Sequence, residues 1–246
     1  MNSPMPSTEL PADVFATTHW TLVLAAGKRR TAQSDSALEQ LCATYWFPLY
    51  AYIRRRGYSR EDAEDLTQAF FARFLEKNYL EDLTAERGKF RAFLLASLKH
   101  FLANEWDKSQ RRKRGGNRVH LSLDWQTADT RFQIAAANAP GPDQAFDREW
   151  AMALLAKVIE RLRGECQADG RSGQFEQLKI FLTAGKGAAS YADAAKSLGM
   201  EEGAARTAAH RLRKRYRELL RDEISQTLAD PSLVEEEMRA LFGAFS

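Results

Sequence analysis

The sequence predicts an all-α protein built from two helical domains joined by a linker. Apolar residues recur at intervals of three and four along most of the 246-residue chain, which is the spacing of one helix face. Strand-like alternation of apolar and polar residues is confined to the short stretch VHLSLDW, residues 119–125. The stretch AAANAPGPD, residues 135–143, has the composition of a linker and divides the helical segments into two groups.

The first helix of the first group is predicted over Ala37–Arg56. Pro48 lies inside this segment and is expected to kink the helix or split it in two, and Gly57 is expected to end it. The predicted apolar face consists of Leu38, Leu41, Tyr45, Leu49, Tyr52 and Ile53.

Ser59 is predicted to cap the second helix, because its hydroxyl can accept a hydrogen bond from a free amide of the first turn. Glu61 and Asp62 suit the positive end of the helix dipole. The predicted apolar face of this helix consists of Leu66, Phe70 and Phe74, flanked by Phe71 and Leu75.

After a loop, a long third helix is expected from about Phe90 to Arg114, where Gly115 stops it. The apolar residues that it carries are Phe90, Phe93, Leu94, Leu98, Phe101 and Trp106.

The second group begins with a helix predicted over Phe146–Arg163, followed by a loop over 164–174 and a short helix over Phe175–Leu182. The apolar side of the first of these helices consists of Trp150, Leu154, Val158 and Leu162. A last apolar stripe consists of Val234, Met238, Leu241, Phe242 and Phe245. We hypothesise that this C-terminal segment folds back on one of the two domains and regulates access to it.

Composition limits the classes of function. The chain is 44% hydrophobic and 28% charged, an ordinary globular mixture that can bury a core. Its net charge is only +3, but basic residues gather in 108–118 and 206–221 and acids in 61–65 and 235–237. Local clusters indicate partners better than the sum does, so two basic clusters predict two contact surfaces for a polyanion.

Several functions are excluded by what the sequence lacks. The two cysteines, Cys42 and Cys166, lie far apart in apolar segments, so we expect reduced core residues and neither a disulfide framework nor a metal site. The start of the chain lacks the basic and apolar runs of a signal peptide, and no apolar stretch reaches the ~18 residues that span a bilayer. A cytoplasmic protein is therefore expected, with a partly disordered N-terminal extension.

The pattern of polar residues also argues against an enzyme. Its four histidines are scattered, with no nucleophile or paired carboxylate at a useful spacing. The stretch GKGAAS, residues 185–190, lacks the spacing of a phosphate-binding loop and follows a predicted helix. No catalytic residue, cofactor or metal is therefore expected.

The segment Tyr191–Leu219 is predicted to be a helix-turn-helix. Helices that meet at a steep angle need a small residue where they approach and favour a glycine in the turn, and Ala195 and Gly199 supply both. The second helix has an apolar face of Ala205, Ala209, Leu212, Tyr216 and Leu219. Its opposite face carries Arg206, His210, Arg213 and Arg217. This division suits a recognition helix in a DNA major groove, although a solvated amphipathic helix would show it too.

Two motifs resemble parts of a known family. The segment 48–77, containing DAEDLTQAFF, followed by 88–114, containing FRAFL and the basic run RRKR, resembles region 2 of bacterial RNA polymerase sigma factors of the sigma-70 family, extracytoplasmic-function group. The stretch YADAAKSLGMEEGAARTAAHRLRKRYREL resembles region 4 of the same family. The resemblance covers about residues 37–115 and 147–224, in the family's order and spacing.

The resemblance implies a division of the chain and a function. Residues 37–116 would be region 2 and residues 146–228 region 4, with a linker over 117–145 and extensions over 1–36 and 229–246. A sigma factor binds core RNA polymerase and directs it to promoters; an anti-sigma or other regulatory protein is a further partner that the family allows. In the family, the linker between regions 2 and 4 passes through the polymerase cleft. The alternating stretch of the linker here, residues 119–125, could also form a strand pair against either domain.

The family's acidic helix docks on core RNA polymerase. The residues that match it here are Asp62, Glu64, Asp65, Gln68 and Phe71. The residues alone favour the simpler explanation that these acids stabilise the start of a helix.

The resemblance also implies DNA contacts. The loop Leu80–Lys89 and the helix after it would bind the melted −10 element, because single strands need cations and surfaces for their bases. The residues implied there are Lys89, Arg91, Lys99, His100, Asn104, Lys108, Arg111 and Arg112. Region 4 would read the −35 element as duplex through Gly203, Arg206, Thr207, His210, Arg211 and Lys214.

Three departures from the family pattern limit what it implies. The family's Arg-Asn pair is Lys99–His100 here and its Trp is Phe93, so base preference does not carry over. A buried Val or Ile early in the recognition helix is Ala205, which is expected to loosen the packing there. Phe90, Phe93 and Phe101 are expected to be core residues rather than stacking surfaces.

Two other functions stay open. A conventional helix-turn-helix regulator would bind duplex DNA without polymerase, but it has no need of the acidic helix. A module that has lost DNA binding and titrates polymerase or a regulator would explain the departures at Ala205 and Lys99–His100.

Overall fold

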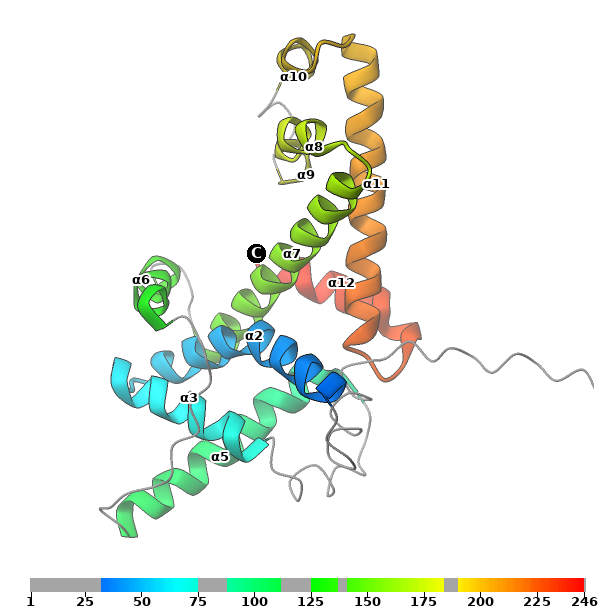
Figure 1. The fold of residues 1–246 in the computed structure, drawn as a ribbon. Helices are drawn as coiled ribbons and strands as arrows, with labels where there is room; N and C mark the ends of the chain where they lie inside the picture. Colours follow the sequence, from blue (N-terminus) through cyan, green and yellow to red (C-terminus); the bar gives the residue numbers. More distant parts are fainter. Residues whose placement is uncertain (1–31, 75–87, 112–124, 137–140, 184–189, 246) are drawn as a thin grey trace, which may run out of the picture.

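The computed structural model describes residues 32–74, 88–111, 125–136, 141–183 and 190–245. Across these residues the regular structure is helical, apart from one isolated antiparallel bridge between Lys89 and Leu228. The prediction of an all-α fold is therefore confirmed. Figure 1 shows α2, α3 and α5 at one end and α8, α9 and α10 at the other, joined by the long helices α7 and α11.

Helix α2, Ala32–Arg55, begins earlier than predicted and runs through Pro48 without a break, so the predicted split is wrong. A proline removes one hydrogen bond of a helix. Burial of the surrounding side chains offsets that loss, since Tyr45 and Leu49 are completely enclosed. Gly57 ends the helix as predicted, with the positive φ of +94° that glycine adopts readily.

Helix α3, Arg60–Phe74, is capped by Ser59 as predicted. The amide of Asp62 donates to the Ser59 hydroxyl at 3.1 Å, and that hydroxyl lies 2.9 Å from the Asp62 carboxylate. The buried face differs from the prediction, because α3 packs against both α2 and α5 and Leu66 lies at the edge. The buried residues are Ala63, Thr67, Phe70, Phe71 and Phe74.

Helix α5, Phe90–Arg111, buries most of its predicted apolar residues, including Phe90 and Phe101. Phe93 is half-buried against the rings of Phe74 and Phe90, so the three phenylalanines are core residues as expected. Trp106, another of the apolar residues that this helix carries, is 58% exposed. The predicted end of this helix at Gly115 lies outside the described residues.

A helix occupies part of the predicted linker. Helix α6, Trp125–Ala136, contacts α2 through side chains: the ring of Trp125 lies edge-on to Trp46 at 5.1 Å, and Phe132 lies beneath the guanidinium of Arg54 at 4.9 Å. Its apolar residues Trp125, Ala128 and Phe132 are three and four apart, which is helical spacing. This helix was not predicted, because Trp125 also continues the strand-like alternation of residues 119–124. Those residues lie outside the described part of the chain.

Helix α7, Pro142–Ala168, extends past both predicted ends, with Pro142 in the first turn where proline is favoured. Its residues Trp150, Leu154, Val158 and Leu162 are buried as predicted. The loop expected over 164–174 shrinks to a turn around Gly170, whose φ is +69°. The short helix predicted over Phe175–Leu182 is two helices, α8 (Ser172–Leu178) and α9 (Ile180–Thr183).

One hydrophobic core joins the two predicted groups of helices. Helix α7 packs against α2 of the first group and against α8 and α11 of the second. Buried residues from α2, α3, α5, α7 and the C-terminal helices form a single cluster. The two groups therefore share α7 in this conformation instead of having separate cores.

The C-terminal segment forms a 3₁₀ turn, Pro231–Leu233, and helix α12, Val234–Gly243. Met238 and Leu241 are buried against α11 and α7, whereas Phe242 is 54% exposed and Phe245 39% exposed. The predicted stripe is thus only partly a packing face. None of the described helices has the length and apolarity that crossing a bilayer requires.

Candidate nucleic-acid and polymerase interfaces

A tight turn joins helix α10, Tyr191–Leu198, to helix α11, Glu202–Gln226. Gly199 has φ +63°, the amide of Met200 donates to the Ala195 carbonyl at 3.0 Å, and the amide of Gly199 donates to Lys196 at 3.3 Å. This is the Schellman pattern of a helix C-terminus, and it needs a residue that tolerates positive φ. Gly199 was predicted in this turn; the Ser190 cap of α10, at 3.3 Å from the Asp193 amide, was not.

The inner face of α11 matches the prediction. Ala205, Ala209, Leu212, Tyr216 and Leu219 are all buried. Ala205 is fully enclosed, so the small residue leaves no exposed gap at this position. The side chains opposite are therefore held outward by a packed helix face.

The outer face of α11 offers cations to solvent. Arg206, His210, Arg211 and Lys214 are exposed, and so are Gly203 and Thr207. Arg206 donates to Glu202 one turn earlier at 2.7 Å, with its side chain 66% exposed. Exposed pairs of this kind contribute under about 1 kcal/mol, so Arg206 can leave Glu202 for a base or phosphate at little cost.

Arg213 does not belong to this outer face, contrary to the prediction. Its Nε donates to the Phe181 carbonyl at 3.0 Å and its Nη2 to the Tyr191 hydroxyl at 2.6 Å. The rings of Phe181 and Tyr191 stack at 4.3 Å. Arg213 therefore fastens α9 and α10 to α11, and nothing in the spacing of α11 itself could have revealed partners so distant in sequence.

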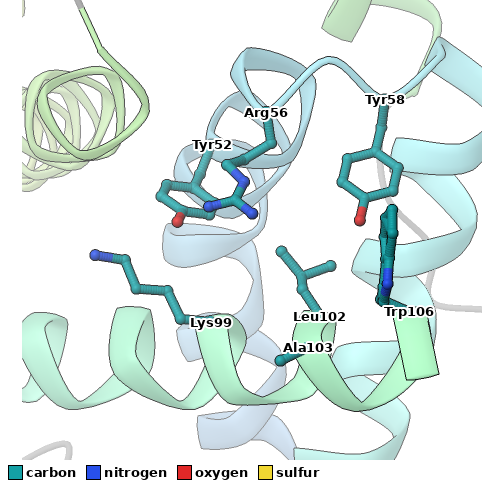
Figure 2. A pocket seen from close by; sticks show the side chains of 7 residues that line it. All are labelled: Tyr52, Arg56, Tyr58, Lys99, Leu102, Ala103 and Trp106. Atoms are coloured by element: carbon teal, nitrogen blue, oxygen red, sulfur yellow. The ribbon is translucent and has the colours of Figure 1, made fainter.

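A pocket lies between the C-terminal end of α2 and helix α5, in the part of the chain expected to bind a single strand. Its volume is about 310 Å³, and Figure 2 shows Tyr58 beside Trp106 at one side, with Tyr52 and Lys99 at the other. The lining residues are Tyr52, Arg56, Tyr58, Lys99, Leu102, Ala103 and Trp106. Rings and cations together suit an unstacked nucleobase and its phosphate.

Sequence reasoning placed Lys99 at the DNA surface but missed the aromatic residues of this pocket. Lys99 lies 2.8 Å from Asp143 and 5.8 Å from the centre of the Tyr52 ring. The sequence pattern assigns Trp106 only as an apolar residue of the helix, whereas this residue is 58% exposed and lines the pocket.

A smaller hollow of about 120 Å³ lies between α3 and α5. Its lining residues are Phe70, Arg73, His100, Phe101 and Asn104. The predicted DNA residues His100 and Asn104 are exposed here, so the structure places them apart from Lys99, on another side of α5.

Lys89 and Arg91 are engaged with carboxylates from later in the chain. Lys89 lies 2.8 Å from Glu236 and 3.0 Å from Glu237. Arg91 pairs with Glu237 and with Asp147, and its guanidinium lies 4.7 Å from the centre of the Trp150 ring. These predicted DNA contacts are therefore occupied within the protein.

The pKa values of two acids at these contacts change in opposite directions. The hydrogen bond from Lys89 lowers the pKa of Glu236 below its ordinary value. Burial raises the pKa of Asp147, although the Arg91 guanidinium acts against that rise. For the other predicted cations of this surface, the side chains of Lys108 and Arg111 and the whole of Arg112 lie outside the described part.

Helix α3 presents part of the predicted polymerase surface. Asp62 and Asp65 are exposed, and Gln68 is half-buried. Glu64 is half-buried too and accepts a hydrogen bond from Arg60 at 2.8 Å. The prediction that Phe71 contacts the polymerase is wrong for this conformation. Its ring is fully buried beside Phe70, so it cannot contact a partner without unpacking α3.

The comparisons with known proteins define the class of this region. The family model described as Sigma-70 region 2 matches residues 45–112, from within α2 to the end of α5. Residues 45–112 are thus similar to sigma-70 region 2, and this similarity supports a sigma factor role in promoter recognition and transcription initiation. Comparisons with curated proteins and with solved structures found no match.

Among the described residues, no group of histidine, cysteine, aspartate and glutamate side chains is arranged to hold a metal ion. Both cysteines are buried and unpaired. Burial raises the pKa of the Cys42 thiol to about 12, so this thiol stays protonated at neutral pH.

Proposed function

We propose that this protein is a sigma factor of the extracytoplasmic-function group, which binds core RNA polymerase in the cytoplasm and directs it to specific promoters. The observation that carries the proposal is the region 2 match over residues 45–112, because that span contains both the acidic helix α3 and the cationic helix α5. Residues 37–116 act as region 2 and residues 146–228 as region 4 in this proposal.

Region 4 reads duplex DNA of the −35 element. Helices α10 and α11 act as a helix-turn-helix, with α11 in the major groove. The exposed cations of α11 support this role, because arginine can donate two hydrogen bonds to guanine while lysine and histidine contact phosphates and base edges. The contact residues are Gly203, Arg206, Thr207, His210, Arg211 and Lys214.

Region 2 holds the melted −10 strand. One unstacked base enters the pocket of Tyr52, Tyr58 and Trp106, where stacking on an aromatic ring contributes about 1–3 kcal/mol per base. Lys99 and Arg56 supply positive charge at the same pocket. His100 and Asn104 contact the strand on the other side of α5, together with Lys108, Arg111 and Arg112.

Core RNA polymerase docks on helix α3 through Asp62, Glu64, Asp65 and Gln68. Exposed carboxylates at the start of α3 suit a basic partner surface and steer its approach. The test is binding of purified core RNA polymerase to the wild type, to Asp65→Arg and to Glu61→Arg. Glu61 is exposed on the same helix and outside the proposed surface, so Glu61→Arg matches the change of charge.

The proposal expects tight binding by the wild type and by Glu61→Arg, with Asp65→Arg at least about tenfold weaker, as for a charge reversed inside an interface. Equal weakening in both variants would show a general charge effect. Absence of binding by a folded wild type would reject the sigma factor role.

A stand-alone regulator is the second candidate. The observation that favours it is the exposure of Arg206, His210, Arg211 and Lys214 on α11, while Lys89 and Arg91 are mostly enclosed and paired with acids of other helices. Such a regulator would protect a specific duplex from nuclease digestion without polymerase. A sigma factor would need polymerase for the same protection.

A further inference from the structure

The C-terminal segment makes backbone contacts with the start of region 2. After α11, residues 227–229 run antiparallel to residues 88–90. The amide of Phe90 donates to the Thr227 carbonyl at 2.9 Å, and the amide of Ala229 donates to the Gly88 carbonyl at 3.4 Å. The end of region 4 is thus hydrogen-bonded to the first residues of α5.

Glu237 of α12 is the centre of an ion cluster at this contact. Its side chain has no exposed surface, and one of its oxygens lies 3.0 Å from the Lys89 amine. Both oxygens accept from Arg91, through Nε and, at 3.3 Å, through Nη2. Such paired charge-assisted hydrogen bonds are among the strongest polar contacts, and removing one partner leaves a buried charge uncompensated.

Two further carboxylates complete the cluster. Glu236 lies 2.8 Å from Lys89, and Asp147 of α7 pairs with Arg91. Three acids from the second half of the chain therefore surround two cations of region 2. A phosphate would make the same kind of bond to these cations, so the acids and a nucleic-acid strand compete for them.

The far side of α12 is anchored to region 4. Met238 and Leu241 are buried, α12 packs on α11, and Glu235 lies 2.9 Å from Arg221 of α11. If the ion cluster breaks, α12 therefore stays with α11 and loses its side-chain contacts with Lys89 and Arg91. Figure 1 shows α12 at the end of α11 that faces α2, opposite the end that carries α10.

We propose that α12 is an intramolecular lock, which reinforces the packing of region 4 on region 2 in the free protein and shields Lys89 and Arg91 from DNA. Glu237 is the element that breaks when the lock opens. The shielding rests on the function proposed above, whereas the closure of the two regions does not.

Closure is tested by amide hydrogen exchange in the full chain. Glu237→Gln removes the charge at the centre of the cluster, and Glu236→Gln weakens the same cluster at an exposed position that the fold does not need. Glu235→Gln is the control, because it removes the same charge two positions before Glu237, from a side chain that pairs with Arg221 of α11. The measured regions are residues 88–90 and 227–243, with α3 and α10 as references.

The lock predicts that Glu237→Gln speeds exchange at residues 88–90 and 227–243 by about tenfold or more, because opening becomes easier there and nowhere else. Glu236→Gln gives a smaller rise in the same places, and Glu235→Gln gives none. Unchanged exchange in Glu237→Gln would overturn the lock. An equal rise in α3 and α10 in both cluster variants would overturn it too, because the cluster would then support the whole fold.

Shielding is tested with a fluorescent single-stranded oligonucleotide of about 12 nucleotides, whose binding is followed by anisotropy. Glu237→Gln is expected to bind about threefold to tenfold more tightly than Glu235→Gln, which carries the same net charge. If the two variants bind with equal affinity while exchange rises only in Glu237→Gln, α12 still closes on region 2 but does not shield Lys89 and Arg91 from DNA. Absence of binding by every variant would count against the proposed function, and the exchange result would still decide the lock.

Discussion

Basic residues occur both on α11 and at the start of α5, but the two groups differ in their exposure to solvent and in their pairing with acids. Arg206, His210 and Arg211 are exposed, and Arg206 forms an ion pair with Glu202 of its own helix. Lys89 and Arg91 are mostly enclosed and bound to acids from α7 and α12. Two basic clusters that look alike in the sequence therefore differ in how far acids from other helices already enclose and pair with them.

Helix α7 packs against both α2 and α11, so we expect the largest loss of stability from a substitution in its buried face. Trp150→Ala removes a buried ring that packs under Arg91 and should lower the free energy of unfolding by about 3–5 kcal/mol. Urea denaturation measures this change. Met152→Ala on the same helix, at a side chain 47% exposed, is the control and should stay within about 0.5 kcal/mol. A loss of under about 1 kcal/mol for Trp150→Ala would contradict the role of α7 as a shared core element.

At the exposed end, Arg206→Ala is expected to weaken binding of a −35 duplex by about 1–3 kcal/mol and to relax the preference at one base position. The measurement is a titration with a set of duplexes that differ by single base pairs. Arg217→Ala, also exposed on α11 but outside the proposed contact set, is the matched control. Equal weakening on every duplex would reduce Arg206 to a phosphate contact.

Arg213 combines features of both groups: it belongs to α11, but it is half-buried and hydrogen-bonded within the protein. Arg213→Lys cannot make both bonds to Phe181 and Tyr191, so the free energy of unfolding should fall by about 1–2 kcal/mol. The folded variant should keep the wild-type preference among duplexes. A change in base preference without loss of stability would return Arg213 to the DNA surface.

The smallest effect is expected at an ion pair between α7 and α11. Hydrogen bonds from Arg215 lower the pKa of Glu165 below its ordinary value of 4.5. A carboxyl with a lowered folded-state pKa stabilises the fold above its unfolded-state pKa, and this contribution is lost as pH falls through the folded-state value. Because the pair is partly exposed, the contribution should be below about 1 kcal/mol.

Urea unfolding of the wild type and Glu165→Gln checks this sign. The wild type should be slightly more stable at about pH 7, and the difference should vanish as pH falls through the lowered folded-state pKa of Glu165. A difference that persists at low pH would show that Glu165 contributes through packing and not through its charge.

Local signals predicted much of the fold. The Ser59 cap, Gly57, Gly199 and the inner face of α11 all follow from the chemistry of a few neighbouring residues. The helix pattern also predicted the buried side of α7. The region 2 resemblance agrees with the family match over residues 45–112.

What sequence reasoning missed depends on partners far along the chain. The roles of Arg213 and Glu237 come from contacts with Tyr191 and Arg91, which no helical spacing connects to them. Phe71 looked available because burial on α3 is set by α2 and α5 together. Helix α6 was missed because a single tryptophan fitted both the strand and the helix pattern.

Transcription by purified core RNA polymerase on genomic DNA fragments, with and without this protein, tests the central claim most directly. Mapping the 5′ ends of the RNA shows where transcription starts. For a sigma factor, we expect a set of starts that requires the protein and is lost with Asp65→Arg but kept with Glu61→Arg. No new starts, from a folded protein that protects a specific duplex without polymerase, would contradict it.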